Sequence, residues 1–386
     1  MSWKNVELGD LCDVLDSQRK PITKRDRTVG EYPYYGATGI VDYVDSYIFD
    51  EKLVLIGEDG AKWESGESTA FIANGKYWVN NHAHVIRPKR DLLLDEWLVY
   101  YFYYKDLKEF VTGLTVPKLN QGQLKIIPIP LPPLSTQQKI VTKLDRIFAE
   151  IDKAMAAAEA NAKNAEALFQ SYLREIFTND DLDWKTAELN SICDIFADGD
   201  WIESKDQSEN GIRLIQTGNV GFGKFKARDS KARYISEETF KRLRCTEIKQ
   251  NDILISRLPD PVGRACIIPK LDVKSITAVD CTIIRVKKEI VITEFFNFFC
   301  QSPQYFEQIR KNITGATRQR ISRSLLGKTQ IPIPPLVKQK DIVSKLLAIS
   351  NELEKSSKSY TEKVNELTKL KQSILSQAFS GGLVKE

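Results

Sequence analysis

A proline-rich stretch that leads into a long apolar-periodic segment occurs twice in this chain. Residues 127–141 read IPIPLPPLSTQQKIV, and residues 331–343 read IPIPPLVKQKDIV. Proline has no amide hydrogen and restricts the residue before it to extended backbone, so each copy predicts a stiff extended segment that ends where a helix begins. The chain is therefore predicted to be a tandem duplication, in which each half is a globular domain followed by a long helix.

Apolar residues after each proline-rich stretch alternate in steps of four and three, which is the pattern of a coiled coil sustained over about five heptads. An offset of 202 residues (336 − 134) superimposes the two series. We expect the helices to pair as an antiparallel coiled coil. The expected seam is Ile140, Leu144, Ile147, Ile151, Ala158 and Leu168 in the first helix, and Ile342, Leu346, Ile349, Leu353, Tyr360, Leu367, Leu370 and Ile374 in the second.

Each half mixes short apolar runs and turn residues with one late helical segment, at residues 95–110 and 293–310. This mixture is typical of an α+β domain, and 386 residues suffice for two such domains with helical connectors. We expect a first globular domain over residues 1–134, a central helix over 135–178, a second globular domain over 179–336 and a C-terminal helix over 337–386.

The distribution of cysteine and histidine argues against disulfides and metal sites. The six cysteines lie far apart without a CxxC pair, and neither His82 nor His84 has a third ligand at a neighbouring position. We therefore expect no metal site and a reducing, cytoplasmic environment. No signal-like N-terminus and no 18-residue apolar run is present, so no membrane association is expected.

The strongest candidate for nucleic-acid binding is residues 312–323, which contain three arginines and a glutamine and no acid. Arginine and glutamine bind the edges of guanine and adenine, although a solvated charge run is the alternative. The net charge of +4 is compatible with binding to double-stranded DNA but does not by itself indicate it. The candidate DNA-binding residues are Arg19, Lys20, Lys24, Arg25, Lys62, His84, Lys118, Asn120, Lys224, Lys226, Arg228, Arg233, Arg257, Arg264, Arg318, Gln319, Arg320 and Arg323.

Sequence motifs for catalysis are missing. The chain has no Walker lysine motif, no dinucleotide glycine fingerprint, no amino-methyltransferase signature and no convincing set of nuclease carboxylates. We therefore expect a protein without catalytic residues. Three other hypotheses are a repressor-like DNA-binding protein that acts alone, a coiled-coil scaffold, and a nuclease in which Asp59 or Asp260 would bind a metal.

The duplicated arrangement resembles the specificity (S) subunit of type I restriction-modification enzymes over essentially the whole chain. The similarity rests on the Thr-Gly loops at Thr112 and Thr314 and on the two proline-rich helix starts. It implies two target recognition domains, each recognising one half of a bipartite asymmetric DNA site. It also implies helices that set the spacing and bind two modification (methyltransferase) subunits. Those partners would supply S-adenosylmethionine chemistry, and restriction (motor-nuclease) subunits would use ATP and magnesium, so the chain itself would hold no cofactor.

Overall fold

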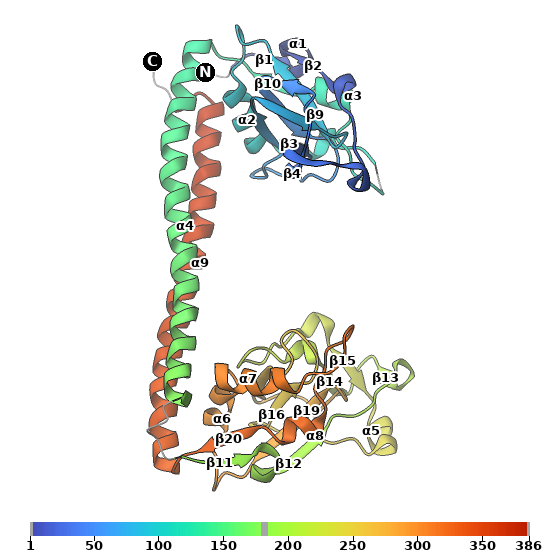
Figure 1. The fold of residues 1–386 in the computed structure, drawn as a ribbon, viewed down its shortest axis with the longest axis vertical. Coiled ribbons are helices and arrows are strands. Elements are labelled where there is room, and N and C mark those ends of the chain that lie inside the picture. Colours follow the sequence, from blue (N-terminus) through green and yellow to red (C-terminus); the bar gives the residue numbers. More distant parts are fainter. Residues whose placement is uncertain (1–2, 114, 179–183, 384–386) are drawn as a thin grey trace. The chain divides into compact units, whose positions relative to one another are not determined.

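The structure, a computed structural model, describes residues 3–113, 115–178 and 184–383 and divides the chain into two compact units. Unit 1 consists of Met1–Glu159 and Thr361–Glu386, and unit 2 consists of Ala160–Tyr360. Each unit contains a globular α+β part and a portion of both long helices (Figure 1). The expected boundary at residue 179 lies outside the described residues. Among the residues that are described, no helix is long and apolar enough to cross a membrane.

The globular part of unit 1 contains two four-stranded sheets and one short strand pair. The first sheet has the order β2(Cys12–Val14), β9(Ala83–Pro88), β6(Leu53–Gly57) and β7(Ala70–Ala73), all antiparallel. The second has the order β4(Gly39–Val44), β3(Val29–Gly36), β8(Lys76–Val79) and β5(Phe49–Asp50). The strand pair joins β1(Asn5–Glu7) to β10(Pro128–Pro130), and the short helices are α1(Leu8–Leu11), α2(Asp95–Tyr104) and α3(Gln121–Lys125).

Unit 2 repeats this plan. Its first sheet has the order β12(Cys193–Asp198), β19(Cys281–Val286), β16(Ile253–Ser256) and β17(Ala265–Ile267). The second has the order β13(Gln207–Ser208), β15(Arg233–Ile235), β14(Ile212–Ile215) and β18(Ser275–Thr277). The strand pair joins β11(Lys185–Glu188) to β20(Gln330–Ile333), and the helices are α5(Glu237–Leu243), α6(Thr293–Phe299), α7(Pro303–Lys311) and α8(Arg323–Gly327). The α+β class and the duplication are therefore confirmed.

The late helix of each half is shorter than predicted. In unit 1, α2 ends at Tyr104 and residues 108–110 form a separate 3-10 turn. In unit 2 the predicted helix is two helices, because Ser302 caps a new helix whose first residue is Pro303. Proline at the first position of a helix loses no intrahelical hydrogen bond, whereas the same proline inside a continuous helix would break it.

The long helices are α4(Leu134–Thr178) and α9(Leu336–Phe379), and each follows a proline-rich strand as predicted. In unit 1 the first half of α4 packs against the end of α9. Lys371 bonds to Asp152, and Lys143 Nζ donates to the carbonyl oxygen of Leu383 at 3.1 Å, so the two segments run antiparallel. In unit 2, Leu173 near the end of α4 shares a core with Ile342 and Leu346 near the start of α9.

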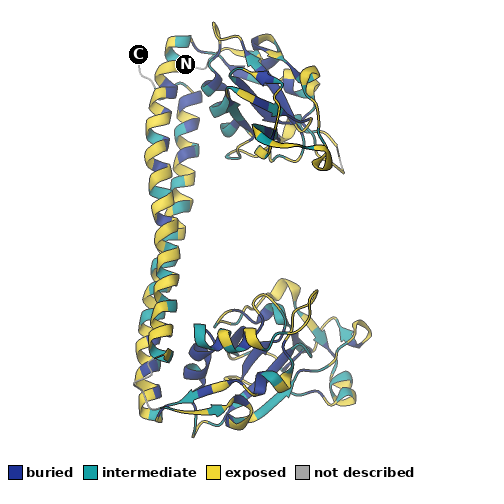
Figure 2. Cartoon of the chain, in the orientation of Figure 1, coloured by how far each residue is buried: buried dark blue, intermediate teal, exposed yellow. Residues whose placement is uncertain are grey.

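The predicted seam is wrong at one position in the later part of each helix, Leu168 and Leu370, whereas Leu367 and Ile374 pack against the core of unit 1 as predicted. Leu168 is 47% exposed and Leu370 is 46% exposed, whereas the neighbouring Leu173, Lys371 and Leu375 are buried. A helix with 3.6 residues per turn drifts relative to a strict 3.5-residue repeat, so the buried face advances by about one residue along each helix. The buried residues therefore follow the helix period more closely than the heptad period. Figure 2 shows that the long helices are largely exposed, with buried and intermediate residues in blue and teal among the yellow ones.

The core of unit 1 joins the first sheet and α2 to the long helices. Trp97 is fully buried, donates from Nε1 to the carbonyl oxygen of Pro130 at 2.9 Å and meets the Phe379 ring edge-on. Unit 2 has the corresponding contacts between Phe177 on α4 and Phe295 and Phe299 on α6. Each globular part is thus fixed to one end of the helix pair by aromatic side chains, which contribute large buried areas.

Candidate nucleic-acid interface

The Thr-Gly loop forms the same closed hairpin in both units. In unit 1, Thr112 and Lys118 exchange backbone hydrogen bonds of 2.9 and 2.8 Å, and in unit 2, Thr314 and Arg320 exchange bonds of 2.8 and 2.9 Å. The glycine after each threonine has a φ of +94°, and a Cβ on it would meet a backbone oxygen at 2.4 Å. Glycine is therefore required at both places. Leu114, within the first hairpin, lies outside the described residues.

A buried residue after each hairpin ties it to the first sheet of its unit. The amide of Leu119 donates to the carbonyl oxygen of Glu58 at 2.8 Å, and the amide of Ile321 donates to that of Arg257 at 3.2 Å. Both Leu119 and Ile321 are fully buried. The hairpins are thus projections of fixed position, while the described residues between their closing pairs are exposed.

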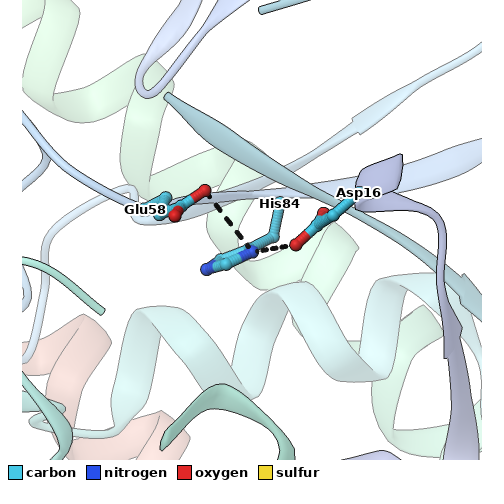
Figure 3. Close-up of side chains that lie close together, drawn as sticks. All are labelled: Asp16, Glu58 and His84. Carbon is cyan, nitrogen blue, oxygen red and sulfur yellow. Dashed lines mark hydrogen bonds and ion pairs between the residues drawn. The ribbon is translucent and has the colours of Figure 1, made fainter. Parts of the chain in front are cut away.

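His84 is one of the candidate DNA-binding residues that the structure contradicts. Its side chain is completely buried, and Nδ1 lies 2.6 Å from Oδ2 of Asp16 (Figure 3). Nε2 lies 2.7 Å from the carbonyl oxygen of Leu119. A side chain without exposed surface cannot contact DNA. His84 instead holds the residue that follows the hairpin.

Asp16, Glu58 and His84 form an ionic cluster beneath the first hairpin. Their ligand atoms lie within 4.8 Å of one another, a spacing that could hold a metal ion. However, Glu58 already accepts from Arg19 at 2.5 Å and from Lys118 at 2.9 Å. Two cations therefore balance the carboxylates, and the geometry fits an ion-pair network better than a metal centre. The sequence analysis missed this cluster because Asp16 and Glu58 come from other parts of the chain.

The charges in this cluster change the pKa of Asp16. Burial raises the pKa, but the hydrogen bond and charge of His84, the amide of Val85 and the charge of Arg19 outweigh burial and lower it from its ordinary value. The Arg19 guanidinium is held by these carboxylates and also donates to the carbonyl oxygen of Ala83 at 2.7 Å, so its hydrogen-bond donors are used inside the protein. Lys118, which is partly exposed, is the member of this network that lies on the hairpin.

Arg257 and Arg264 are also buried, which contradicts their prediction as DNA contacts. Arg264 donates to the carbonyl oxygens of Thr217, Val220 and Leu258, each at 2.8 Å, and burial lowers its pKa. Arg257 donates to the carbonyl oxygen of Val279 at 2.6 Å. Both guanidinium groups hold loops together through these hydrogen bonds to backbone carbonyl oxygens.

Five of the exposed candidates of unit 2 lie in two places, the hairpin and a hollow. On the hairpin, Arg318, Gln319 and Arg320 are exposed, and Arg318 lies 3.4 Å from Asp280. A hollow of about 370 Å³ lies among residues of the second sheet and its loops. It is lined by Gln216, Asn219, Arg228, Lys231, Ala232 and Arg233. Of the remaining candidates, Lys226 is exposed, Lys224 pairs with Glu354 on α9, and Arg323 lies 3.9 Å from Asp198.

The exposed candidates of unit 1 are less concentrated. Lys20, Lys24, Arg25 and Lys62 are exposed, and Arg25 and Lys62 have acidic neighbours in Asp26 and Glu67. Asn120 caps α3, since its Oδ1 accepts from the amide of Gln123 at 3.0 Å. This cap occupies its side-chain oxygen.

Near the first hairpin lies a hollow of about 500 Å³ that the sequence analysis did not predict. Val41, Asn80, His82 and Val116 line it. The duplication offered one signal for Val116 itself, because this residue stands at the position of the candidate Arg318 when the two hairpins are superimposed.

Comparison with known proteins shows where this architecture occurs. The family model for the type I restriction modification DNA specificity domain matches residues 1–159 and 181–363. A putative type I restriction enzyme specificity subunit of Haemophilus influenzae is 30% identical over 351 residues, which cover 89% of this chain and 86% of that protein. The type I restriction enzyme MjaVIII specificity subunit of Methanocaldococcus jannaschii is 23% identical over 94% of this chain and 90% of its own length.

Solved structures share the fold. A chain from a study of complex assembly and conformational transition of the type I R-M system has a TM-score of 0.74 at 21% identity, covering 99% of this chain and 98% of that chain. The HsdS subunit from Thermoanaerobacter tengcongensis has a TM-score of 0.52 at 20% identity, covering 99% of this chain and 97% of its own.

Proposed function

Because this chain belongs to the type I restriction-modification DNA specificity family, we propose that it selects the DNA sequence on which a type I modification complex acts. Each globular part recognises one half of a bipartite site, and the long helices set the distance between the halves. The observation that carries the proposal is the repeated hairpin, which has the same backbone bonds in both units but different side chains. Two equivalent loops with different side chains are suited to two different half-sites.

The arginine hairpin of unit 2 is the place where base recognition is best supported. Arg318 and Gln319 are exposed on a loop of fixed position. Arginine makes paired hydrogen bonds to guanine and glutamine makes them to adenine, and each such contact is worth about 1–3 kcal/mol against the wrong base. In contrast, Lys226, Arg228 and Arg233 belong to a basic region of the same unit that suits phosphate groups.

The proposed partners follow from the same role. The chain binds double-stranded DNA together with two modification (methyltransferase) subunits, and restriction (motor-nuclease) subunits join the full complex. Exposed apolar side chains on the long helices, such as Leu168, Tyr172 and Leu370, support a further protein contact there. S-adenosylmethionine, ATP and magnesium are used by those partner subunits, and this chain supplies specificity without catalysing a reaction.

The test is to sequence methylated adenines in DNA from cells that co-express this chain with its candidate modification subunit, beside cells that carry the subunit alone. A bipartite asymmetric motif with a fixed gap, present only with this chain, is the expected result. If no methylation depends on the chain, the proposal is wrong. Tight, sequence-specific DNA binding by the chain alone would then favour the repressor-like alternative.

A further inference from the structure

Val116 in unit 1 and Arg318 in unit 2 occupy the same position of the repeated hairpin (116 + 202 = 318). In each hairpin the backbone oxygen of this residue lies beside the glycine that has a φ of +94°. Val116 is 64% exposed, and the Arg318 side chain is 72% exposed. An apolar and a cationic side chain thus project from the same point of two equivalent loops, which is where two half-sites of different sequence would be distinguished.

A second exposed valine lines the same hollow as Val116. Val41, on β4, is 52% exposed and lines the same hollow of about 500 Å³. Single exposed apolar residues are common on protein surfaces and need no explanation. Here, however, two of them come from separate segments and line one hollow, so together they offer an apolar contact for a small group.

Three polar side chains, those of Asp59, Asn80 and His82, also line the hollow. Nδ1 of the His82 ring is hydrogen-bonded to the Asp59 carboxylate, which fixes the orientation of the ring. The amide of His82 donates to Oδ1 of Asn80 at 2.8 Å, which orients that side chain. In the major groove an A·T pair presents a methyl group, a carbonyl acceptor and an amino donor side by side. The hollow combines apolar surface, which complements the methyl group, with polar side chains beside it.

We propose that Val116, together with Val41, contacts the 5-methyl group of a thymine in the half-site bound by unit 1, and so selects thymine at that position. This inference rests on the proposed function. Cytosine at the same place has no methyl group and would leave the two valines against water. Val116 is therefore a specificity-determining residue, although it carries no charge and makes no hydrogen bond through its side chain.

The experiment uses the chain assembled with its modification subunit. The DNA duplexes contain the motif that adenine methylation has defined. Each thymine of both half-sites is replaced in turn by deoxyuridine, which removes only the methyl group. At one position, deoxyuridine weakens binding about fourfold, which is the effect of one buried methyl group. In a Val116→Ser complex, the difference between thymine and deoxyuridine at that position is reduced, because only Val41 still contacts the methyl group.

The matched control is Val29→Ser, at a valine of β3 that is 88% exposed and does not line the hollow. The control complex keeps the fourfold difference. The proposal is overturned if the parent complex binds every substituted duplex equally well, or if Val116→Ser preserves the difference. Failure of the proposed function is distinguishable, because the parent chain would then direct no methylation and define no motif.

Discussion

Gln137 and Gln339 make the same three hydrogen bonds in the two units. Gln137 accepts from the amide of Leu94 at 3.0 Å and donates to the carbonyl oxygens of Leu92 and Pro132 at 2.8 and 2.9 Å. Gln339 accepts from the amide of Ile292 at 2.8 Å and donates to the carbonyl oxygens of Ile290 and Pro334 at 2.9 and 2.8 Å. Both side chains are fully buried. Each glutamine therefore fixes the start of a long helix to the segment that precedes the late helix of its own unit.

Gln137→Ala is expected to lower the free energy of unfolding by about 2–3 kcal/mol, because it removes a buried side chain and three hydrogen bonds, of which the one to Pro132 is fully buried. Chemical denaturation of the full chain measures this loss. Gln138→Ala is the control, since the neighbouring glutamine is exposed, and it should change stability by less than about 0.5 kcal/mol. Equal effects of the two substitutions would contradict the role of Gln137.

The corrected contact face of α9 predicts unequal effects of two leucines. Leu375 is fully buried, so Leu375→Ala should cost about 2–5 kcal/mol, whereas Leu370→Ala, at an exposed position, should cost less than about 1 kcal/mol. The same denaturation measurement compares them. A larger loss of unfolding free energy for Leu370→Ala than for Leu375→Ala would support the heptad position of Leu370 and contradict the contact face described here.

The lowered pKa of Asp16 predicts an acid-dependent contribution to stability. A carboxylate with a lowered pKa stabilises the folded state above its unfolded value of about 3.9, and this contribution is lost as the pH falls through the folded pKa. Asp16→Asn should therefore reduce the pH dependence of unfolding below about pH 4 without changing its slope near neutrality. A parent chain and variant with identical acid profiles would contradict this.

Base-contacting and phosphate-contacting arginines should differ in their effects on the assembled complex. Arg318→Ala is expected to relax sequence preference in one half-site by about 1–3 kcal/mol. Arg233→Ala should weaken binding to all sequences alike and reduce the salt dependence of log K by about one unit of slope. Titrations at several salt concentrations, with matched and mismatched duplexes, separate the two. The assignment fails if Arg318→Ala weakens both duplexes equally.

The parts of the fold that depend on local sequence could be predicted, and the parts that depend on distant residues could not. Consecutive prolines restrict their own backbone, so both long helices and their preceding strands were visible in the sequence. The heptad phase at Leu168 and Leu370 was wrong because small angular differences accumulate along a long helix. His84 looked available because nothing in its neighbourhood reveals that Asp16 and the Leu119 carbonyl enclose it.

The arginines show the same limit at the candidate site. Arg318 and Arg264 are equally basic and both lie near glycine-containing turns, yet one is exposed and the other binds three carbonyl oxygens in the interior. Composition cannot separate them, because burial is decided by loops that are distant in sequence. The duplication was the better guide, since it aligned Thr112 with Thr314 and thereby located both hairpins.

The central claim, that each unit recognises its own half of a DNA site, is tested most directly by comparing adenine methylation motifs. Cells co-expressing the modification subunit receive either the parent chain or a chain with Arg318→Ala and Gln319→Ala on the exposed hairpin of unit 2. The account predicts that one half of the motif becomes degenerate while the other half and the gap stay unchanged. Simultaneous change in both halves, or an unchanged motif, would contradict it.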